Sequence, residues 1–146
     1  MAMDIQYIDH FTIRSRPQDV DALRDFYGDV LGLRPGLRPD FKFPGYWMYL
    51  GDRPVVHIAG SLPVDGPMAP KGLPGSTGQF DHVSFRTGDL DAVRTKLDSL
   101  GITYQGTPVP GFDLYQLFFY DPVGLKVELT FDVRRDGALQ NVTESR

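Results

Sequence analysis

The sequence contains no cysteine. Disulfide bonds, thiolate nucleophiles and cysteine-ligated zinc or iron–sulfur centres are therefore excluded. Basic residues are not in excess either, because 15 Lys and Arg stand against 19 Asp and Glu. The resulting net charge of −4 offers no positive field for nucleic acid or anionic lipid. No apolar run approaches the roughly 20 residues of a membrane helix, and the N-terminus has no apolar stretch typical of a signal peptide. We therefore expect a cytoplasmic protein with neither nucleic-acid nor membrane partners.

What the chain does contain is enough apolar material for one folded domain. Of its 146 residues, 41% are hydrophobic and 12% are aromatic. A chain of this length buries enough surface to be stable without disulfide or metal cross-links, so we predict a single domain over 1–146. Two segments break the pattern. Residues 60–79 hold nine Gly or Pro among 20 positions and predict an irregular connection, and residues 132–146 form a polar C-terminal tail.

The sequence repeats itself. Residues 8–14 read IDHFTIR and residues 80–86 read FDHVSFR, which share an Asp-His-x-[Ser/Thr]-x-Arg pattern. Residues 19–24 resemble 89–94, and residues 46–52 resemble 115–121. The shift between the copies lies between 69 and 72 residues, as expected for duplicated units whose loops have changed length. We interpret this as two modules, over residues 5–59 and 80–131.

Each module reads as a strand, a helix and three further strands. Alternating apolar residues predict the strands, and apolar spacing of three and four residues after Asp19 and Asp89 predicts the helices. Gly32 stands where a glycine would end the first helix. The fold class is therefore α+β, with two tandem βαβββ modules, a mixed sheet facing inward and helices outside. The expected strands cover 5–14, 33–39, 45–51, 54–59, 80–87, 102–107, 113–120 and 124–130, and the second helix covers 89–100.

All the histidines fall at related places in the two modules. His10 and His82 occupy the same position of the first strand, and superimposing residues 55–59 on 126–130 places Glu128 where His57 stands. Because strand side chains alternate between faces, each pair should share one sheet face, opposite the apolar neighbours. Burying such polar groups without a partner is costly. Imidazoles and a carboxylate are common ligands of divalent cations, so we predict one metal site formed by His10, His57, His82 and Glu128.

These features resemble the vicinal oxygen chelate superfamily. The resemblance covers residues 5–131 and rests on the paired modules, the first-strand histidines and the D-P-x-G-x-x-x-E ending at Glu128. The family contains glyoxalase I, extradiol dioxygenases, fosfomycin-resistance proteins and metal-free bleomycin-resistance proteins. The resemblance implies a U-shaped sheet around a metal that chelates two vicinal substrate oxygens. His10, His82 and Glu128 match widely shared ligand positions, and His57 stands where glyoxalase I has a glutamate.

The resemblance implies a metal-dependent enzyme of the lyase or isomerase type, acting on a small substrate through an enediolate-like intermediate. The metal would be Fe, Mn, Zn, Ni or Co, with Glu128 as a ligand that doubles as general base and His57 as the weakest ligand. A non-haem Fe(II) dioxygenase is the alternative, although the chain has no further histidine and carries Phe118 where ring-cleaving relatives have a tyrosine. A metal-free binding or resistance protein is the third reading.

Substrate contacts are predicted from position. Arg14 matches a residue that glyoxalases use for a glutathione carboxylate, and Arg86 is its counterpart in the second module. Tyr49, Tyr115 and Tyr120 lie on strands that would line the pocket. Other aromatic residues predicted for the pocket wall are Trp47, Phe41, Phe43 and Phe112. Open sheet edges and an apolar concave face further predict a homodimer.

Overall fold

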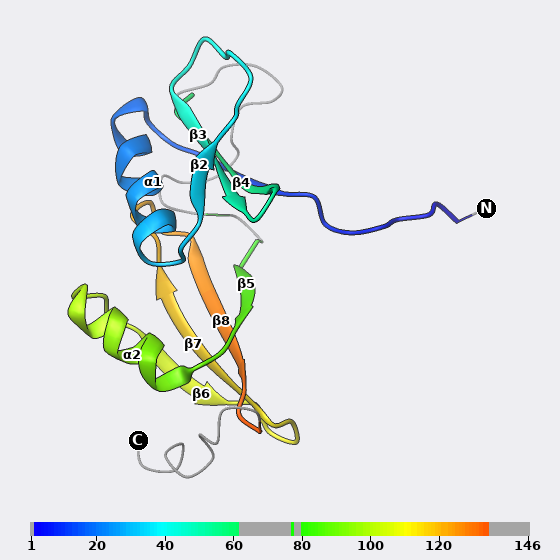
Figure 1. The fold of residues 1–146 in the computed structure, drawn as a ribbon, viewed down its shortest axis with the longest axis vertical. Coiled ribbons are helices and arrows are strands. Elements are labelled where there is room, and N and C mark those ends of the chain that lie inside the picture. The colour runs from blue at the N-terminus through cyan, green and yellow to red at the C-terminus, as the bar shows by residue number, and fades with distance from the viewer. Residues whose placement is uncertain (1, 62–76, 78–79, 135–146) are drawn as a thin grey trace. The chain divides into compact units, whose positions relative to one another are not determined.

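The computed structural model of this chain describes residues 2–61, 77 and 80–134 (Figure 1). The chain divides after residue 70 into two compact units, and each contains its own four-stranded sheet. The predicted α+β class and the two βαβββ modules are confirmed. The sequence also predicts that both sheets join into one U-shaped sheet. This depends on the placement of the units relative to one another, so it stays a prediction. Most of the connection at 60–79 and most of the tail at 132–146 lie outside the described residues.

Unit 1 is a strand, a helix and three strands, in the predicted order. Its sheet has the strand order β1-β4-β3-β2, in which β1 runs parallel to β4 and the other pairs are antiparallel. A short 3-10 turn, η1, precedes the helix. The elements are β1 (Phe11–Arg14), η1 (Pro17–Asp19), α1 (Val20–Asp29), β2 (Arg34–Gly36), β3 (Gly45–Leu50) and β4 (Arg53–Ala59).

Unit 2 repeats this topology. Its sheet has the order β5-β8-β7-β6, again with one parallel pair, between β5 and β8. The sequence repeat is therefore a structural repeat. The elements are β5 (His82–Thr87), α2 (Leu90–Ser99), β6 (Gln105–Pro108), β7 (Leu114–Tyr120) and β8 (Lys126–Asp132).

Strand pairing sets the correspondence between the units. Trp47 lies opposite His57, and Phe118 lies opposite Glu128, so these strands correspond at a shift of 71 residues. The sequence match of 46–52 with 115–121, at a shift of 69, is thus two residues out of register. Trp47 and His57 are ten positions apart in the sequence, as are Phe118 and Glu128, so both strands of each pair share the shift of 71. A displacement by two residues leaves each side chain on the predicted face of the sheet, because strand side chains alternate with a period of two.

The core of each unit lies between its helix and one face of its sheet. In unit 1, Leu23 and Tyr27 of α1 and Val56 of β4 are fully buried. In unit 2 the corresponding face carries Leu117, Phe119, Val127, Leu129 and Phe131. The intervening strand residues, including His57 and Glu128, therefore point to the face away from the helix. The helix-facing positions predicted for Val56, Ile58, Val127 and Leu129 agree with their burial.

The first strand is shorter than the sequence predicts. The predicted strand spans 5–14, but β1 covers only Phe11–Arg14. Ile5 and Ile8 are 78% and 89% exposed. Apolar alternation favours a strand only where a neighbouring strand supplies hydrogen bonds, and β4 pairs with β1 from Phe11 onward. None of the helices among the described residues is long and apolar enough to cross a membrane.

Candidate metal-binding residues and an adjoining cavity

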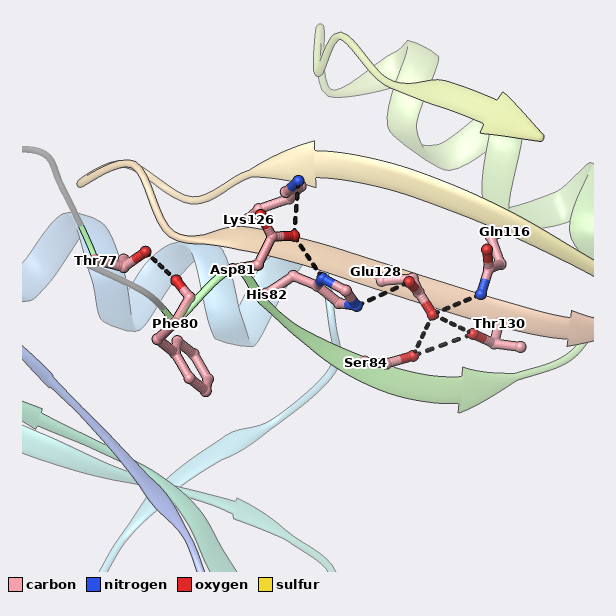
Figure 2. Close-up of polar contacts among 9 residues, drawn as sticks. All are labelled: Thr77, Phe80, Asp81, His82, Ser84, Gln116, Lys126, Glu128 and Thr130. Atoms are coloured by element: carbon pink, nitrogen blue, oxygen red, sulfur yellow. Dashed lines mark hydrogen bonds and ion pairs between the residues drawn. The ribbon is translucent and has the colours of Figure 1, made fainter. Parts of the chain in front are cut away.

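In unit 2 the two predicted ligands lie side by side (Figure 2). His82 begins β5 and Glu128 lies in the adjacent strand β8. The distance from Nε2 of His82 to Oε2 of Glu128 is 3.1 Å. A nitrogen lone pair and a carboxylate oxygen repel at this distance unless a proton or a cation lies between them. This donor pair therefore fits a divalent cation, because imidazole nitrogen and carboxylate oxygen are both accepted as ligands.

Three hydrogen bonds hold the Glu128 carboxylate in place. Its Oε1 accepts from Oγ of Ser84 at 2.7 Å, Nε2 of Gln116 at 2.9 Å and Oγ1 of Thr130 at 2.7 Å. Figure 2 shows all three donors on one side of the carboxylate. Glu128 is only 6% exposed, so these bonds offset the cost of burying a charge. They also leave Oε2 directed at His82.

An aspartate orients the His82 ring. Nδ1 of His82 donates to Oδ2 of Asp81 at 2.7 Å, and the same oxygen accepts from Nζ of Lys126 at 2.9 Å. These contacts with Lys126 and His82 lower the pKa of Asp81 below its usual value. The carboxylate is therefore ionised and fixes the proton on Nδ1. Metal-bound histidines are usually held in this way, with the far ring nitrogen at a carboxylate.

In unit 1 the predicted ligands are also adjacent, but their rings are stacked. His10 immediately precedes β1, and its Nδ1 lies 2.6 Å from Oδ2 of Asp9, as in unit 2. The rings of His10 and His57 are 3.7 Å apart with an interplanar angle of 12°. On its other side, His57 stacks on Trp47 at 3.9 Å. Parallel rings direct their in-plane lone pairs side by side, so one ring must turn before both bind the same ion.

His57 carries a buried polar atom without a partner. Its Nε2 is buried and has no hydrogen bond among the described residues. Burial, together with the nearby His10, lowers the pKa of His57 below its usual value. The ring is therefore neutral near pH 7, which is the form that binds metals. His10 is one-third exposed and precedes its strand, so its ring has room to turn away from the stack.

The four predicted ligands form two pairs, one in each unit. Within the described part of the chain, no group of three His, Asp or Glu side chains gathers at one point. We predict that all four side chains bind one ion, namely His10, His57, His82 and Glu128. This convergence depends on the placement of the two units and stays a prediction. The local geometry fits a divalent cation well in unit 2 and fits it in unit 1 after a ring rotation.

A cavity of about 350 Å³ opens beside His57 in unit 1. Its walls are largely aromatic, and two arginines line it. The lining residues are Thr12, Arg14, Arg38, Phe41, Phe43, Trp47, His57, Ile58, Ala59 and Ser61. Arg14, predicted from the sequence as a substrate contact, thus lies at the same cavity as His57.

The three predicted tyrosine contacts have different surroundings within their own units. Tyr49 donates its hydroxyl to the backbone oxygen of Leu37 at 2.6 Å. Tyr115 is 2% exposed and its hydroxyl accepts from Arg94 of α2, so it belongs to the helix-facing core. Tyr120 is 62% exposed at the end of β7. Phe112 is also exposed, at 69%.

The sequence reasoning missed residues that position or adjoin the predicted ligands. Asp9, Asp81 and Ser84 all belong to the repeated Asp-His-x-[Ser/Thr] pattern, so the repeat itself was the available signal. Gln116 and Thr130 gave no local signal, because only strand pairing brings them to Glu128. Arg38 lies within the predicted strand 33–39 and also gave no local signal, because only the tertiary structure brings it to the cavity.

Comparison with known proteins agrees with these features. Residues 7–129 match the profile of the Glyoxalase/Bleomycin resistance protein/Dioxygenase superfamily. Glyoxylase I 4 of Arabidopsis thaliana is 31% identical over 128 residues, which cover 84% of this chain and 68% of that protein.

Solved structures share the fold at lower identity. A glyoxalase family protein from Bacillus anthracis has a TM-score of 0.68 at 22% identity, covering 90% of this chain and 99% of its own. Lactoylglutathione lyase from Agrobacterium tumefaciens has a TM-score of 0.64 at 24% identity, covering 88% and 96%. An antibiotic-binding protein from Streptomyces sp. CB03234 has a TM-score of 0.64 at 22% identity, covering 90% and 99%.

Proposed function

Because this chain belongs to the Glyoxalase/Bleomycin resistance protein/Dioxygenase superfamily, we propose that it is a metal-dependent enzyme of the lyase or isomerase type. Its substrate would be a small molecule with vicinal oxygens, converted through an enediolate-like intermediate. One observation carries the proposal: each unit places its two predicted ligands in contact, His10 on His57 and His82 beside Glu128. In both units an aspartate holds Nδ1 of the first histidine.

The donor set assigns roles to this chain's own residues. His10, His57, His82 and Glu128 would hold the ion, which is Fe, Mn, Zn, Ni or Co. A bound divalent cation would act as a Lewis acid and stabilise negative charge on the substrate oxygens. Asp9 and Asp81 keep the protons on Nδ1, so that Nε2 of His10 and His82 is the ligand atom.

Glu128 is the best candidate for the general base. Its Oε1 accepts from three donors, whereas the one polar contact of Oε2 within the described residues is with His82. Oε2 is therefore the atom available for a proton taken from a substrate carbon. Ser84, Gln116 and Thr130 position the carboxylate without touching the substrate.

Metal binding and reaction class can be tested together. Purified protein, stripped with a chelator, is titrated with Mn²⁺, Fe²⁺, Co²⁺, Ni²⁺ and Zn²⁺ by calorimetry, and its metal content is measured by elemental analysis. Turnover of α-ketoaldehyde hemithioacetals is then assayed under nitrogen and under air. The proposal expects one ion per site and turnover without oxygen uptake. Failure of every metal to bind the wild-type protein contradicts it.

Variants separate the ligands. His10→Ala should lose the metal, whereas His57→Ala should keep part of it, because the His57 ring is held in a stack between His10 and Trp47. Glu128→Gln should abolish turnover while three imidazoles still hold an ion. If Glu128→Gln keeps full activity, or His57→Ala loses all metal while His10→Ala does not, these roles are wrong.

Two other functions remain as outcomes of the same experiment. Iron together with oxygen uptake would select a dioxygenase, for which two histidines and a carboxylate suit Fe(II). Ligand binding without metal would select a binding protein. The parallel stack of His10, His57 and Trp47 beside the cavity favours this second alternative over the first, because it resembles an aromatic binding wall. We also propose that the protein is a cytoplasmic homodimer.

A further inference from the structure

On the sheet face that carries His57, unit 1 has small residues where unit 2 has larger polar ones. At the shift of 71 residues, Gly45 and Ala59 correspond to Gln116 and Thr130 of unit 2. In unit 2 those side chains cover the sheet face around Glu128. In unit 1 their absence leaves the open face beside His57, and Ala59 lines the cavity.

Arg38 occupies part of the space that Gly45 leaves. A Cβ at Gly45 would collide with the backbone oxygen of Ile58 and would lie 3.0 Å from Nη2 of Arg38. Nη2 donates to the backbone oxygen of Phe43 at 2.9 Å. The guanidinium lies over the rings of Phe41 and Phe43, at 4.9 and 5.2 Å from their centroids. Backbone and aromatic contacts therefore hold this charge in place.

Among the described residues, no carboxylate forms an ion pair with Arg38, and its buried Nε has no hydrogen-bond acceptor. Arg14 also lines the cavity, and no Asp or Glu is among the lining residues. A guanidinium can donate several N–H groups to one carboxylate and binds it strongly. The cavity therefore selects a negatively charged ligand.

The walls of the cavity are flat. The Phe41 and Phe43 rings are stacked at 5.0 Å with 10° between their planes. Trp47 and His57 form a second stack, also with 10° between their planes. A volume of about 350 Å³ lies at the lower end of the range of small-molecule sites. Flat aromatic walls of this size suit a planar, conjugated molecule.

We propose that this cavity binds a small planar organic anion, such as an aryl or conjugated carboxylate, with Arg38 as its charged anchor. This inference narrows the substrate class of the proposed function. It rests on the proposed function in one respect, namely that the bound molecule is the substrate and lies beside His57. Binding itself uses the charge of Arg38 and the aromatic walls, so it does not require a metal.

The test uses the full-length protein in the presence of a chelator, with trans-cinnamate as the probe. Trp47 is the only tryptophan of the chain and lines the cavity, so its fluorescence reports binding there. Cinnamate should change this fluorescence saturably. The neutral isostere cinnamamide should bind at least tenfold more weakly, a difference of about 1.4 kcal/mol.

Three variants identify the anchor. Arg38→Met keeps the apolar stem and should weaken cinnamate binding tenfold or more without changing the affinity for cinnamamide. Arg38→Lys should fall between this variant and the wild type. Arg34→Met is the matched control, because Arg34 is an exposed cation in β2 outside the cavity, and it should bind as the wild type does.

Every outcome bears on the proposal. Equal affinities for cinnamate and cinnamamide, unchanged cinnamate binding by Arg38→Met, or no binding by the wild type would overturn it. Ala59→Leu, which fills the cavity without altering charge, should abolish binding of both probes. Because no metal is present, failure here differs from failure of the proposed function, which the metal titration tests.

Discussion

A buried charge has to be matched by nearby donors, and Glu128 illustrates how closely. One of its oxygens receives three hydrogen bonds, while the polar group nearest the other, in the described part of the chain, is His82. The same position in unit 1 holds a histidine, and two of the three corresponding donors are replaced by Gly45 and Ala59. A neutral imidazole does not require the donors that an ionised carboxylate does. The chemistry of a single residue thus accounts for the different surroundings of the two equivalent positions.

Removing one donor to Glu128 should therefore destabilise the protein. Thr130→Val keeps the shape of the side chain but leaves the buried carboxylate with one bond fewer. We expect the free energy of unfolding to fall by about 1–3 kcal/mol, as for a hydrogen bond to a charged group. Urea unfolding measures this change. Thr107→Val, on the exposed strand β6, is the control and should change stability by less than about 0.5 kcal/mol.

The pKa of His57 gives a second prediction at this scale. Burial and the neighbouring His10 favour the neutral ring and lower the pKa. In the metal-free protein, NMR should show His57 titrating below about 6.5, the value of an unperturbed histidine. The folded state then binds fewer protons than the unfolded chain. Stability is fully present above about pH 6.5 and declines as the pH falls through the pKa of folded His57.

The contribution of His57 to this pH dependence can be isolated. His57→Gln removes the titrating group, so its stability should depend less on pH between about 6.5 and the folded pKa. If the stability of His57→Gln and of the wild type depended on pH identically, burial would not lower the pKa of His57.

Equivalent helices can start differently even when their sequences match. Asp19 and Asp89 are the N-cap residues of α1 and α2, and the sequences that follow them are similar. Asp89 accepts a hydrogen bond from the backbone nitrogen of Ala92 at 3.1 Å and has a positive φ of 56°. Asp19 makes no such bond and instead pairs with Arg16, because Pro17 starts a 3-10 turn one step earlier. The residue before the helix, as well as the cap, decides the helix start.

This difference predicts unequal costs for the same substitution. Asp89→Ala removes a helix cap and places a Cβ-bearing residue without a local hydrogen bond at positive φ, so it should lower stability by about 2 kcal/mol. Asp89→Gly relieves the backbone strain and should lower stability by only a few tenths of a kcal/mol. Asp19→Ala should lower it by less than about 1 kcal/mol, because only an exposed ion pair is lost. Urea unfolding followed by circular dichroism tests this order, and an equal cost for Asp89→Ala and Asp19→Ala would contradict it.

At the scale of the whole molecule, exposed apolar side chains indicate association. Met3, Ile5 and Ile8 lie in the segment before β1 and are 85%, 78% and 89% exposed. Several exposed apolar side chains in one segment are typical of interfaces. Both sheets also end in open strands, namely β1 and β2 in one unit and β5 and β6 in the other.

We therefore expect a homodimer in solution. Multi-angle light scattering should give about twice the chain mass of 16.4 kDa at micromolar concentration. Ile5→Asp together with Ile8→Asp should shift the equilibrium toward the monomer, because it places charges on the exposed apolar segment. A mass near 16.4 kDa for the wild type would count against the dimer.

The sequence by itself determined the repeat, the α+β class, the order of elements and the face on which each candidate ligand lies. These follow from local periodicity and from duplication, both of which are readable without contacts. It overestimated the strand at 5–14, because alternation does not reveal whether a partner strand exists. The sequence also predicts Tyr115 as a pocket residue, whereas in the structure its ring points toward α2 and contacts Arg94.

Only the tertiary structure decided which groups surround the ligand candidates. The donors to Glu128 come from three strands, β5, β7 and β8, and no sequence spacing links them. The ring stack of His10, His57 and Trp47 likewise depends on the pairing between β1, β4 and β3. The cavity depends in addition on the loop after β2, which carries Arg38. Hydrogen bonds and ring contacts of this kind join residues far apart in the chain, so they are set by the register of the sheet rather than by local pattern.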